Sequence, residues 1–97
     1  MATSTITNSS DYKVNVQQIE DTDSTGSQYK SNATVTADSI SGYYPIGVVG
    51  LRERTIANVL FYGLYIDAGY VYYSWQTINN SVVKNHKFDV YVLYKKN

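Results

Sequence analysis

Residues 56–78, IANVLFYGLYIDAGYVYYSWQTI, carry the pattern that decides the fold. Two runs rich in tyrosine, valine and other apolar residues, 56–66 and 70–78, flank the short segment Asp67-Ala68-Gly69. Aromatic and β-branched residues favour strands, and a short Asp/Gly segment between two such runs is typical of a hairpin turn. The first run is apolar on both faces and needs cover on both. We therefore predict a β-hairpin whose first strand is covered on both sides.

Four further runs have strand character: residues 12–19, 29–39, 43–51 and 86–94. In 29–39 the alternation is regular, with Tyr29, Ala33, Val35 and Ala37 on one face and polar residues on the other. No stretch has a convincing helical period of 3.6 residues, and polar turn-forming segments separate the runs. The spacing of the turn signals predicts an all-β fold, a compact antiparallel β-sandwich (jelly-roll-like or Greek key) of about six to eight short strands.

The chain of 97 residues has the length of one domain. Residues 29–97 are expected to form the sandwich, and residues 1–28 a polar N-terminal lead-in with a possible first strand. An arm exchanged with a neighbouring chain, or a segment without fixed structure, are the alternatives for this lead-in. A domain of this size has a modest core and often gains stability from partners.

The composition excludes several classes of function. Eight basic and eight acidic residues give zero formal charge, which argues against nucleic acid and against a polybasic membrane anchor. The absence of cysteine excludes disulfides, thiol catalysis and thiolate metal sites. The longest charge-free apolar stretch, residues 55–66, is too short to span a bilayer, and no signal peptide is visible. We expect a protein made in the cytosol, or a fragment expressed with a start methionine, without membrane insertion and without a cofactor.

The sequence shows no catalytic constellation. His86 is a lone histidine among lysines and is expected at the surface. No nucleophile elbow, phosphate-binding loop or metalloprotease helix is present. Asp67 and Asp89 could act as a glycosidase pair only if the fold brought them together. We therefore expect a protein that is not an enzyme, and an enzyme acting on surface polysaccharide is the weakest of the hypotheses carried forward.

The segment Asp21-x-Asp23-x-Thr25-Gly26 resembles the opening of a calcium-binding loop, with oxygen ligands at alternate positions and glycine at the sixth. The twelfth position holds Asn32 in place of the bidentate glutamate that closes such a site. The flanking segments are predicted strands, where a calcium loop of this kind has helices. We interpret the segment as a polar loop tip, and ion binding by the loop stays open.

Tyrosine is the strongest functional signal, with 11 of the 97 residues. A tyrosine combines a flat apolar ring with a hydroxyl group, which suits protein interfaces and sugars. A domain with six short strands cannot bury eleven rings. We assign one set to a candidate ligand-binding surface: Tyr43, Tyr44, Tyr70 and Tyr72. We assign a second set to the core or to a subunit interface: Tyr62, Tyr65, Tyr73 and Tyr91.

Three segments resemble a known kind of domain: SGYYPIGVVG at 41–50, FYGLYI at 61–66 and VYVLYK at 90–95. They are similar to a small β-rich domain at the C-terminal end of phage tail, fibre and minor structural proteins of Firmicutes, including gut phages. The resemblance covers residues 29–97. It implies an all-β homotrimeric domain at the distal end of a virion appendage, and it carries over no functional residues. The sequence departs from such proteins in the fibre shaft, which it is too short to contain, and the alternatives left open are a fragment, a free-standing decoration protein and a domesticated prophage gene.

These observations lead to two main hypotheses. The first is a phage structural domain that trimerises and binds the host surface, through carbohydrate. The second is a purely structural capsid fibre, decoration or trimerisation module that contacts no receptor. In a trimer, one face of the strand at 56–66 would lie inside the subunit: Ile56, Leu60, Tyr62 and Leu64. The other face would form the subunit interface, with the reverse assignment left open: Val59, Phe61 and Tyr65.

Overall fold

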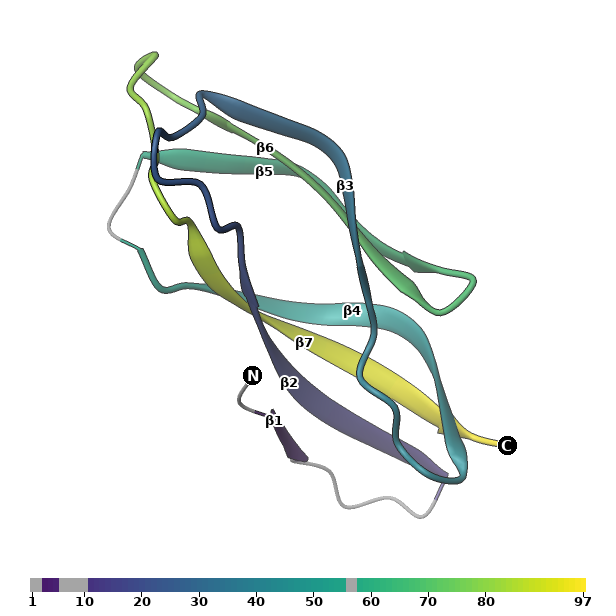
Figure 1. Ribbon diagram of the computed structural model, residues 1–97. Coiled ribbons are helices and arrows are strands. Elements are labelled where there is room, and N and C mark those ends of the chain that lie inside the picture. Colours follow the sequence, from purple (N-terminus) through teal and green to yellow (C-terminus); the bar gives the residue numbers. More distant parts are fainter. Residues whose placement is uncertain (1–2, 6–10, 56–57) are drawn as a thin grey trace.

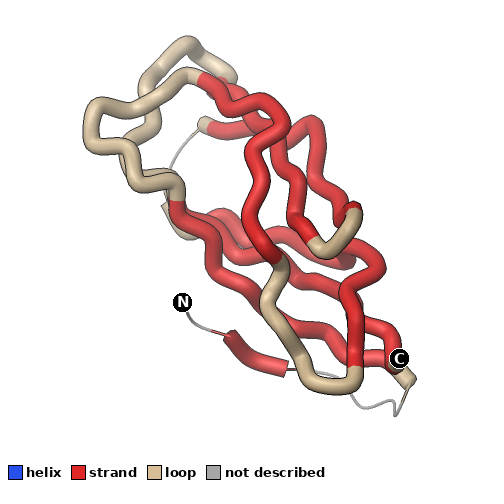
Figure 2. Tube along the Cα trace, turned by 45° about the vertical axis from the view of Figure 1, so that its right-hand side comes forward, coloured by secondary structure: helices blue, strands red, loops and turns tan. Residues whose placement is uncertain are grey.

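The computed structural model describes residues 3–5, 11–55 and 58–97. Seven strands follow one another along the chain (Figure 1). Their bounds are β1 (Thr3–Thr5), β2 (Tyr12–Glu20), β3 (Tyr29–Thr36), β4 (Tyr43–Glu53), β5 (Val59–Asp67), β6 (Tyr70–Thr77) and β7 (Lys87–Lys96). Only strands and loops occur in the described part of the chain (Figure 2). These residues accordingly include no helix that could cross a membrane.

The strands form two antiparallel sheets. One has the order β1-β2-β7-β4 and the other the order β3-β6-β5. Figure 1 shows the second sheet lying across the first, with β6 between β3 and β5 in one sheet and β7 between β2 and β4 in the other. Apart from β1–β2 and the hairpin β5–β6, each connection passes from one sheet to the other. The sandwich predicted from the sequence is thereby confirmed.

The core lies between β6 and β7. The inward residues of these two strands supply its largest buried side chains, among them Trp75, Phe88 and Tyr94. Burial and the nearby Asp38 carboxylate raise the pKa of Tyr94 to about 12. The hydroxyl group therefore remains protonated at neutral pH and donates to the Asp38 carbonyl at 2.6 Å. This hydrogen bond ties the central strand of one sheet to the segment that leaves β3 in the other.

The predicted strands are present, with small shifts at their ends, and the hairpin turn is Ala68-Gly69. Both turn residues have positive φ values, 51° and 84°, as a two-residue hairpin with the native twist requires. The start of the fourth predicted strand, residues 56–57, lies outside the described residues. The segment from Tyr12 to Glu20 is a full member of the sandwich, paired with β7 along its whole length. The sandwich therefore begins before residue 29, where the sequence interpretation had placed its boundary.

The inward face of β2 is polar at two of its three buried positions, the third being Ile19. Asn15 and Gln17 are fully buried, whereas Val14 and Val16 lie on the outer face of the sheet beside Leu93 and Tyr91. The amide group of Gln17 makes two hydrogen bonds to backbone groups, as a strand residue would. Its Nε2 donates to the Thr36 carbonyl, and its Oε1 accepts from the Asp38 N–H, both at 2.9 Å. Gln17 thus satisfies backbone groups where β3 ends and joins the two sheets.

Two loops meet at one end of the sandwich, the β2–β3 loop and the β6–β7 loop (Figure 1, upper left). Ser27 and Val83 exchange two backbone hydrogen bonds of 3.0 and 2.9 Å. Gly26 has a φ of 89°, and a Cβ atom there would lie 2.1 Å from a methyl carbon of Val82. Only glycine allows the loops to approach this closely. The loops consequently form a rigid frame at the start of β3.

Candidate functional site

Two β-bulges face each other across β6. One lies in β3 between Lys30 and Ala33, and the other in β5 between Phe61 and Gly63. Ser74 of β6 stands between them, and its hydroxyl oxygen accepts from the N–H of Asn32, which has a φ of 51°. A bulge inserts one residue and reverses the alternation beyond it, which is how bulges redirect side chains near functional sites.

The bulge in β3 places Tyr29 on the outer face of its sheet. Lys30 joins Ala33 and Val35 on the inner face, because the extra residue shifts the alternation by one. The regular alternation predicted for 29–39 had put Tyr29 on the same face as Ala33, so that assignment is wrong. The sequence does hold a signal for the bulge, since asparagine tolerates the left-handed conformation that Asn32 adopts.

The bulge in β5 has the same effect on the hairpin strand. Val59 and Phe61 pack against the core before the bulge, and Leu64 and Ile66 do so after it. Leu60 and Tyr62, expected inside the subunit, are exposed. Of the three predicted interface residues, only Tyr65 is at the surface, and Val59 and Phe61 are turned inward. The face assignment is thus reversed for the first half of the strand.

A tyrosine-rich surface results on the outer face of β3, β6 and β5. Its members, which we call the tyrosine face, are Tyr29, Tyr62, Tyr65, Tyr70 and Tyr72. The exposed fractions of the first four side chains are 65, 55, 47 and 44%. Each of these exposed aromatic rings leaves apolar area in water.

Tyr65 and Tyr72 lie directly opposite each other in the register of β5 and β6. Their rings are stacked, with centroids 4.9 Å apart and planes inclined by 1°. Such cross-strand aromatic pairs stabilise a sheet and restrict the rotation of both rings. The pair therefore presents a fixed aromatic surface. Tyr70 and Tyr72, both predicted as ligand-binding residues, lie on this face.

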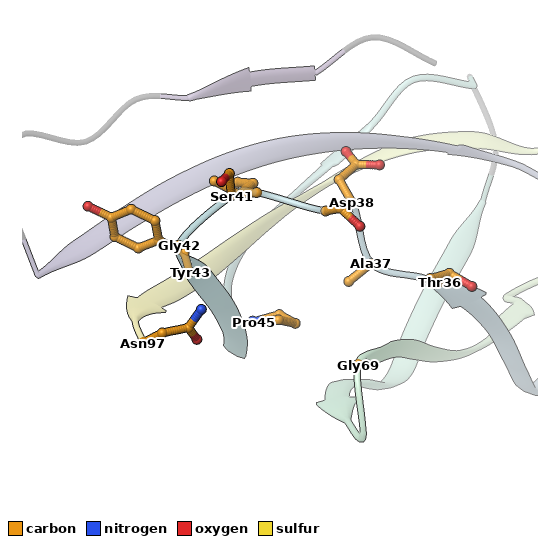
Figure 3. A pocket seen from close by; sticks show the side chains of 11 residues that line it. Thr36, Ala37, Asp38, Ser41, Gly42, Tyr43, Pro45, Gly69 and Asn97 are labelled. Carbon is orange, nitrogen blue, oxygen red and sulfur yellow. The ribbon is translucent and has the colours of Figure 1, made fainter.

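The other two predicted ligand-binding residues, Tyr43 and Tyr44, belong to β4 in the opposite sheet. Tyr44 is exposed there, and Tyr43 is half-buried against the core with the Lys13 ammonium 4.5 Å from its ring centroid. Tyr43 lines a hollow of about 360 Å³ between the β3–β4 connection, the β5–β6 turn and Asn97 (Figure 3). The structure does not bring the four predicted tyrosines together.

Sequence reasoning missed a hollow at the loop end of the tyrosine face. It has a volume of about 210 Å³ and is lined by Gln28, Tyr29, Tyr62, Gln76, Thr77 and Asn80. A second hollow, of about 540 Å³, shares Gln28 and Tyr29 with it and extends along the edge strand β3. Tyr29 therefore lines both hollows. Without knowledge of the bulges, nothing in the sequence separates these tyrosines from core residues.

His86 is buried, contrary to the expectation of a surface residue. Its ring lies among Trp75, Phe61 and Phe88, at centroid distances of 4.7, 5.6 and 5.0 Å. Its Nε2 atom is 2.8 Å from both carboxylate oxygens of Glu53. These aromatic neighbours come from three different strands. The lysines beside His86 in the sequence had suggested a surface position, which is wrong. The residue closes one end of the core.

The two aspartates of the calcium-like segment point in different directions. Asp21 is buried and accepts hydrogen bonds from the Tyr73 hydroxyl and the Trp75 indole N–H. Asp23 accepts from Ser27 Oγ at 2.6 Å, from the Gly26 N–H at 2.9 Å and from Thr25 Oγ1 at 3.0 Å. No cluster of three acidic or histidine side chains that could hold a metal occurs within residues 11–55 and 58–97. The geometry favours a loop stabilised by its own hydrogen bonds.

The hydrogen bonds to Asp23 make the loop sensitive to acid. They hold the pKa of its carboxyl below the ordinary value of 3.8, the bond from Ser27 contributing most. The unfolded chain then binds this proton more readily, so the stabilisation is present above the unfolded-state pKa and is lost as the pH falls through the folded-state value. We expect Asp23→Asn to lower the free energy of unfolding at about pH 7 and to match the wild type at about pH 2. Urea unfolding at both pH values measures this, and a difference independent of pH would contradict it.

Asp67 and Asp89 lie on different sheets. Asp67 ends β5 at the hairpin turn, whereas Asp89 is buried on β7, with Arg54 Nη1 3.0 Å from its carboxylate. Cross-strand neighbours place Asp67 on the outer face of one sheet and Asp89 on the outer face of the other. The fold therefore does not assemble this carboxylate pair.

Comparisons with models of protein families, with curated proteins and with solved structures found no match to this chain.

Proposed function

We propose that this domain is a non-enzymatic adhesion module of a bacteriophage virion, a tail fibre or receptor-binding tip that binds carbohydrate on the host surface through the tyrosine face. The sequence resemblance of residues 29–97 supports the assignment to a virion. The chemistry of the face supports carbohydrate, because a sugar ring offers an apolar C–H surface to an aromatic ring and hydroxyl groups to polar neighbours.

The observation that carries the proposal is the concentration of exposed tyrosines on one sheet. Tyr29, Tyr62, Tyr65 and Tyr70 are each exposed to 44% or more and come from three adjacent strands. The stacked pair of Tyr65 and Tyr72 fixes part of this surface before any ligand arrives. A preformed surface lowers the entropy cost of binding, so a shallow site can still be selective.

A glycan array followed by calorimetric titration tests the proposal. We expect the wild type to bind at least one oligosaccharide on the array, and Tyr65→Ala to weaken this binding about tenfold, because the substitution removes one ring of the stacked pair. Tyr44→Ala is the matched control, since Tyr44 is exposed to 44% and Tyr65 to 47% but the two lie on opposite sheets.

Two results would contradict the proposal. The first is an array on which the wild type binds no glycan. The second is equal weakening by Tyr44→Ala and Tyr65→Ala, which would place the ligand outside the tyrosine face. Thermal unfolding of both variants shows whether each still folds.

The second candidate function is a purely structural module. Apolar side chains exposed on the edge strand β4, Ile46, Val49 and Leu51, favour it, because an assembly would remove them from water. We also propose a homotrimer for the adhesion module. Light scattering on a sizing column then gives about three times the chain mass of 10.9 kDa. A trimer that binds no glycan would favour the structural module, and a monomer at every concentration would remove trimerisation from both.

A further inference from the structure

The loop end of the tyrosine face has the features of a built subsite. Tyr29 is the most exposed tyrosine of the face, at 65%, and it lines both the hollow of about 210 Å³ and the hollow of about 540 Å³. The smaller hollow lies below the range of about 300–1,000 Å³ typical of complete small-molecule pockets, so it suits a group of the size of one sugar ring. The larger hollow shares Gln28 and the Tyr29 ring with it.

The walls of the smaller hollow combine aromatic and amide groups. Tyr29 and Tyr62 supply rings, and Gln76 lies directly opposite Tyr29 in the register of β3 and β6. A primary amide both donates and accepts hydrogen bonds in one plane, which matches the hydroxyl groups of a sugar. Amide and aromatic groups side by side thus complement both surfaces of a sugar ring.

The frame around Tyr29 is held in place on both sides. The Gln28 side chain donates from Nε2 to the Asn80 carbonyl at 2.8 Å, and the Gln28 carbonyl accepts from the Thr77 N–H at 2.9 Å. The bond between the Asn32 N–H and the Ser74 hydroxyl oxygen fixes the bulge that turns Tyr29 outward. These hydrogen bonds hold the site in one shape, which lowers the cost of binding.

The charge of the lining selects the class of ligand. Among the described residues that line the two hollows, Lys30 alone carries a formal charge. Its ammonium group lies 3.8 Å from the Asp21 carboxylate, which compensates it. Neither hollow offers an uncompensated cation for an acidic sugar or a carboxylate for a basic group, so a neutral ligand is favoured.

We propose that Tyr29 is the central platform of a subsite for neutral oligosaccharides, with one sugar unit on its ring and one in each adjoining hollow. This inference rests on the proposed carbohydrate-binding function and assigns its site and ligand class. Because three units contact the protein at this subsite, a trisaccharide binds more tightly than the corresponding monosaccharide, and longer chains gain further affinity only by reaching the stacked rings of Tyr65 and Tyr72.

Calorimetric titration of the full chain tests the subsite. The probes are neutral oligomers of glucose, galactose and N-acetylglucosamine, from monosaccharide to hexasaccharide, with oligogalacturonate as the acidic counterpart. We expect a neutral trisaccharide to bind and Tyr29→Ala to raise its Kd at least about tenfold. Tyr29→Phe keeps the ring and is expected to stay within about threefold of the wild type. The exposed position of Tyr29 lets both variants fold, and their thermal unfolding checks this.

The outcomes separate the subsite from the general function. A neutral probe whose Kd is unchanged in Tyr29→Ala but raised in Tyr65→Ala would overturn the subsite and leave the adhesion function intact. Binding of oligogalacturonate alone would overturn the neutral class. Binding of no probe would overturn this inference, and the glycan array would then decide the adhesion function independently.

Discussion

Gln17→Leu is expected to lower the free energy of unfolding by about 2–3 kcal/mol, because it removes both hydrogen bonds of the buried amide. Leucine has a similar volume, so no large cavity arises. The Thr36 carbonyl and the Asp38 N–H, each 2.9 Å from the Gln17 amide, lose their partner. A buried group left unsatisfied costs about 1–3 kcal/mol, and these two lie at the lower end because both hydrogen bonds are partly buried. Since domains are stable by only about 5–15 kcal/mol, urea unfolding resolves this change readily.

Gln18→Leu is the matched control for this expectation. Gln18 is the next residue of the same strand, but its side chain lies on the outer face, as its pairing with Asp89 indicates. The same substitution there should change the free energy of unfolding by no more than about 0.5 kcal/mol. Equal effects at the two positions would show that the amide of Gln17 contributes nothing specific.

Asp21→Ala is expected to lower the free energy of unfolding by about 3 kcal/mol, through the two donors that it leaves buried. The Tyr73 hydroxyl and the Trp75 indole N–H, 3.4 Å from Asp21 Oδ2, both donate to this carboxylate. Burial, together with the Asp21 carboxylate, raises the pKa of Tyr73 well above its usual range, so the hydroxyl keeps its proton and still needs an acceptor. The destabilisation extends into the core, because the rings of Tyr73 and Trp75 belong to it.

Asp23→Ala in the same loop separates this effect from a general disturbance of the loop. Asp23 is half-buried, and the hydrogen bonds to its carboxylate stay within residues 23–27. We expect a clearly smaller shift of the urea midpoint than for Asp21→Ala. A larger shift for Asp23→Ala would mean that the loop, and not the buried donors of the core, determines stability here.

The positions of the strands could be predicted from the sequence. Alternating apolar residues and turn-forming segments act within a few residues, and the Ala68-Gly69 turn is a local feature of the same kind. The sequence also indicated that tyrosine carries the functional signal, and Tyr70 and Tyr72 do lie on the tyrosine face. Tyr29 and Tyr62 could not be assigned to it, because the bulges that turn them outward form against Ser74 of another strand.

The burial of polar residues in the core could not be predicted from the sequence either. Hydrophobicity favours Val14 and Val16 over Asn15 and Gln17 for the inner face of β2. The structure places the polar pair inside, because Gln17 there meets backbone groups of Thr36 and Asp38, where β3 ends. These partners are 19 and 21 residues away in the sequence, so no local pattern reveals them. His86 is buried for a related reason, since Glu53, its hydrogen-bonding partner, is 33 residues distant.

The sequence by itself determined the class of the fold, the strands and the abundance of tyrosine, because these depend on composition and on patterns of short range. Tertiary structure alone decided which side of each strand meets water. A single inserted residue reverses the alternation of a strand, and whether it is inserted depends on the neighbouring strand with which it pairs. The tyrosine face and the hollows beside Tyr29 result from the bulges that this strand pairing produces.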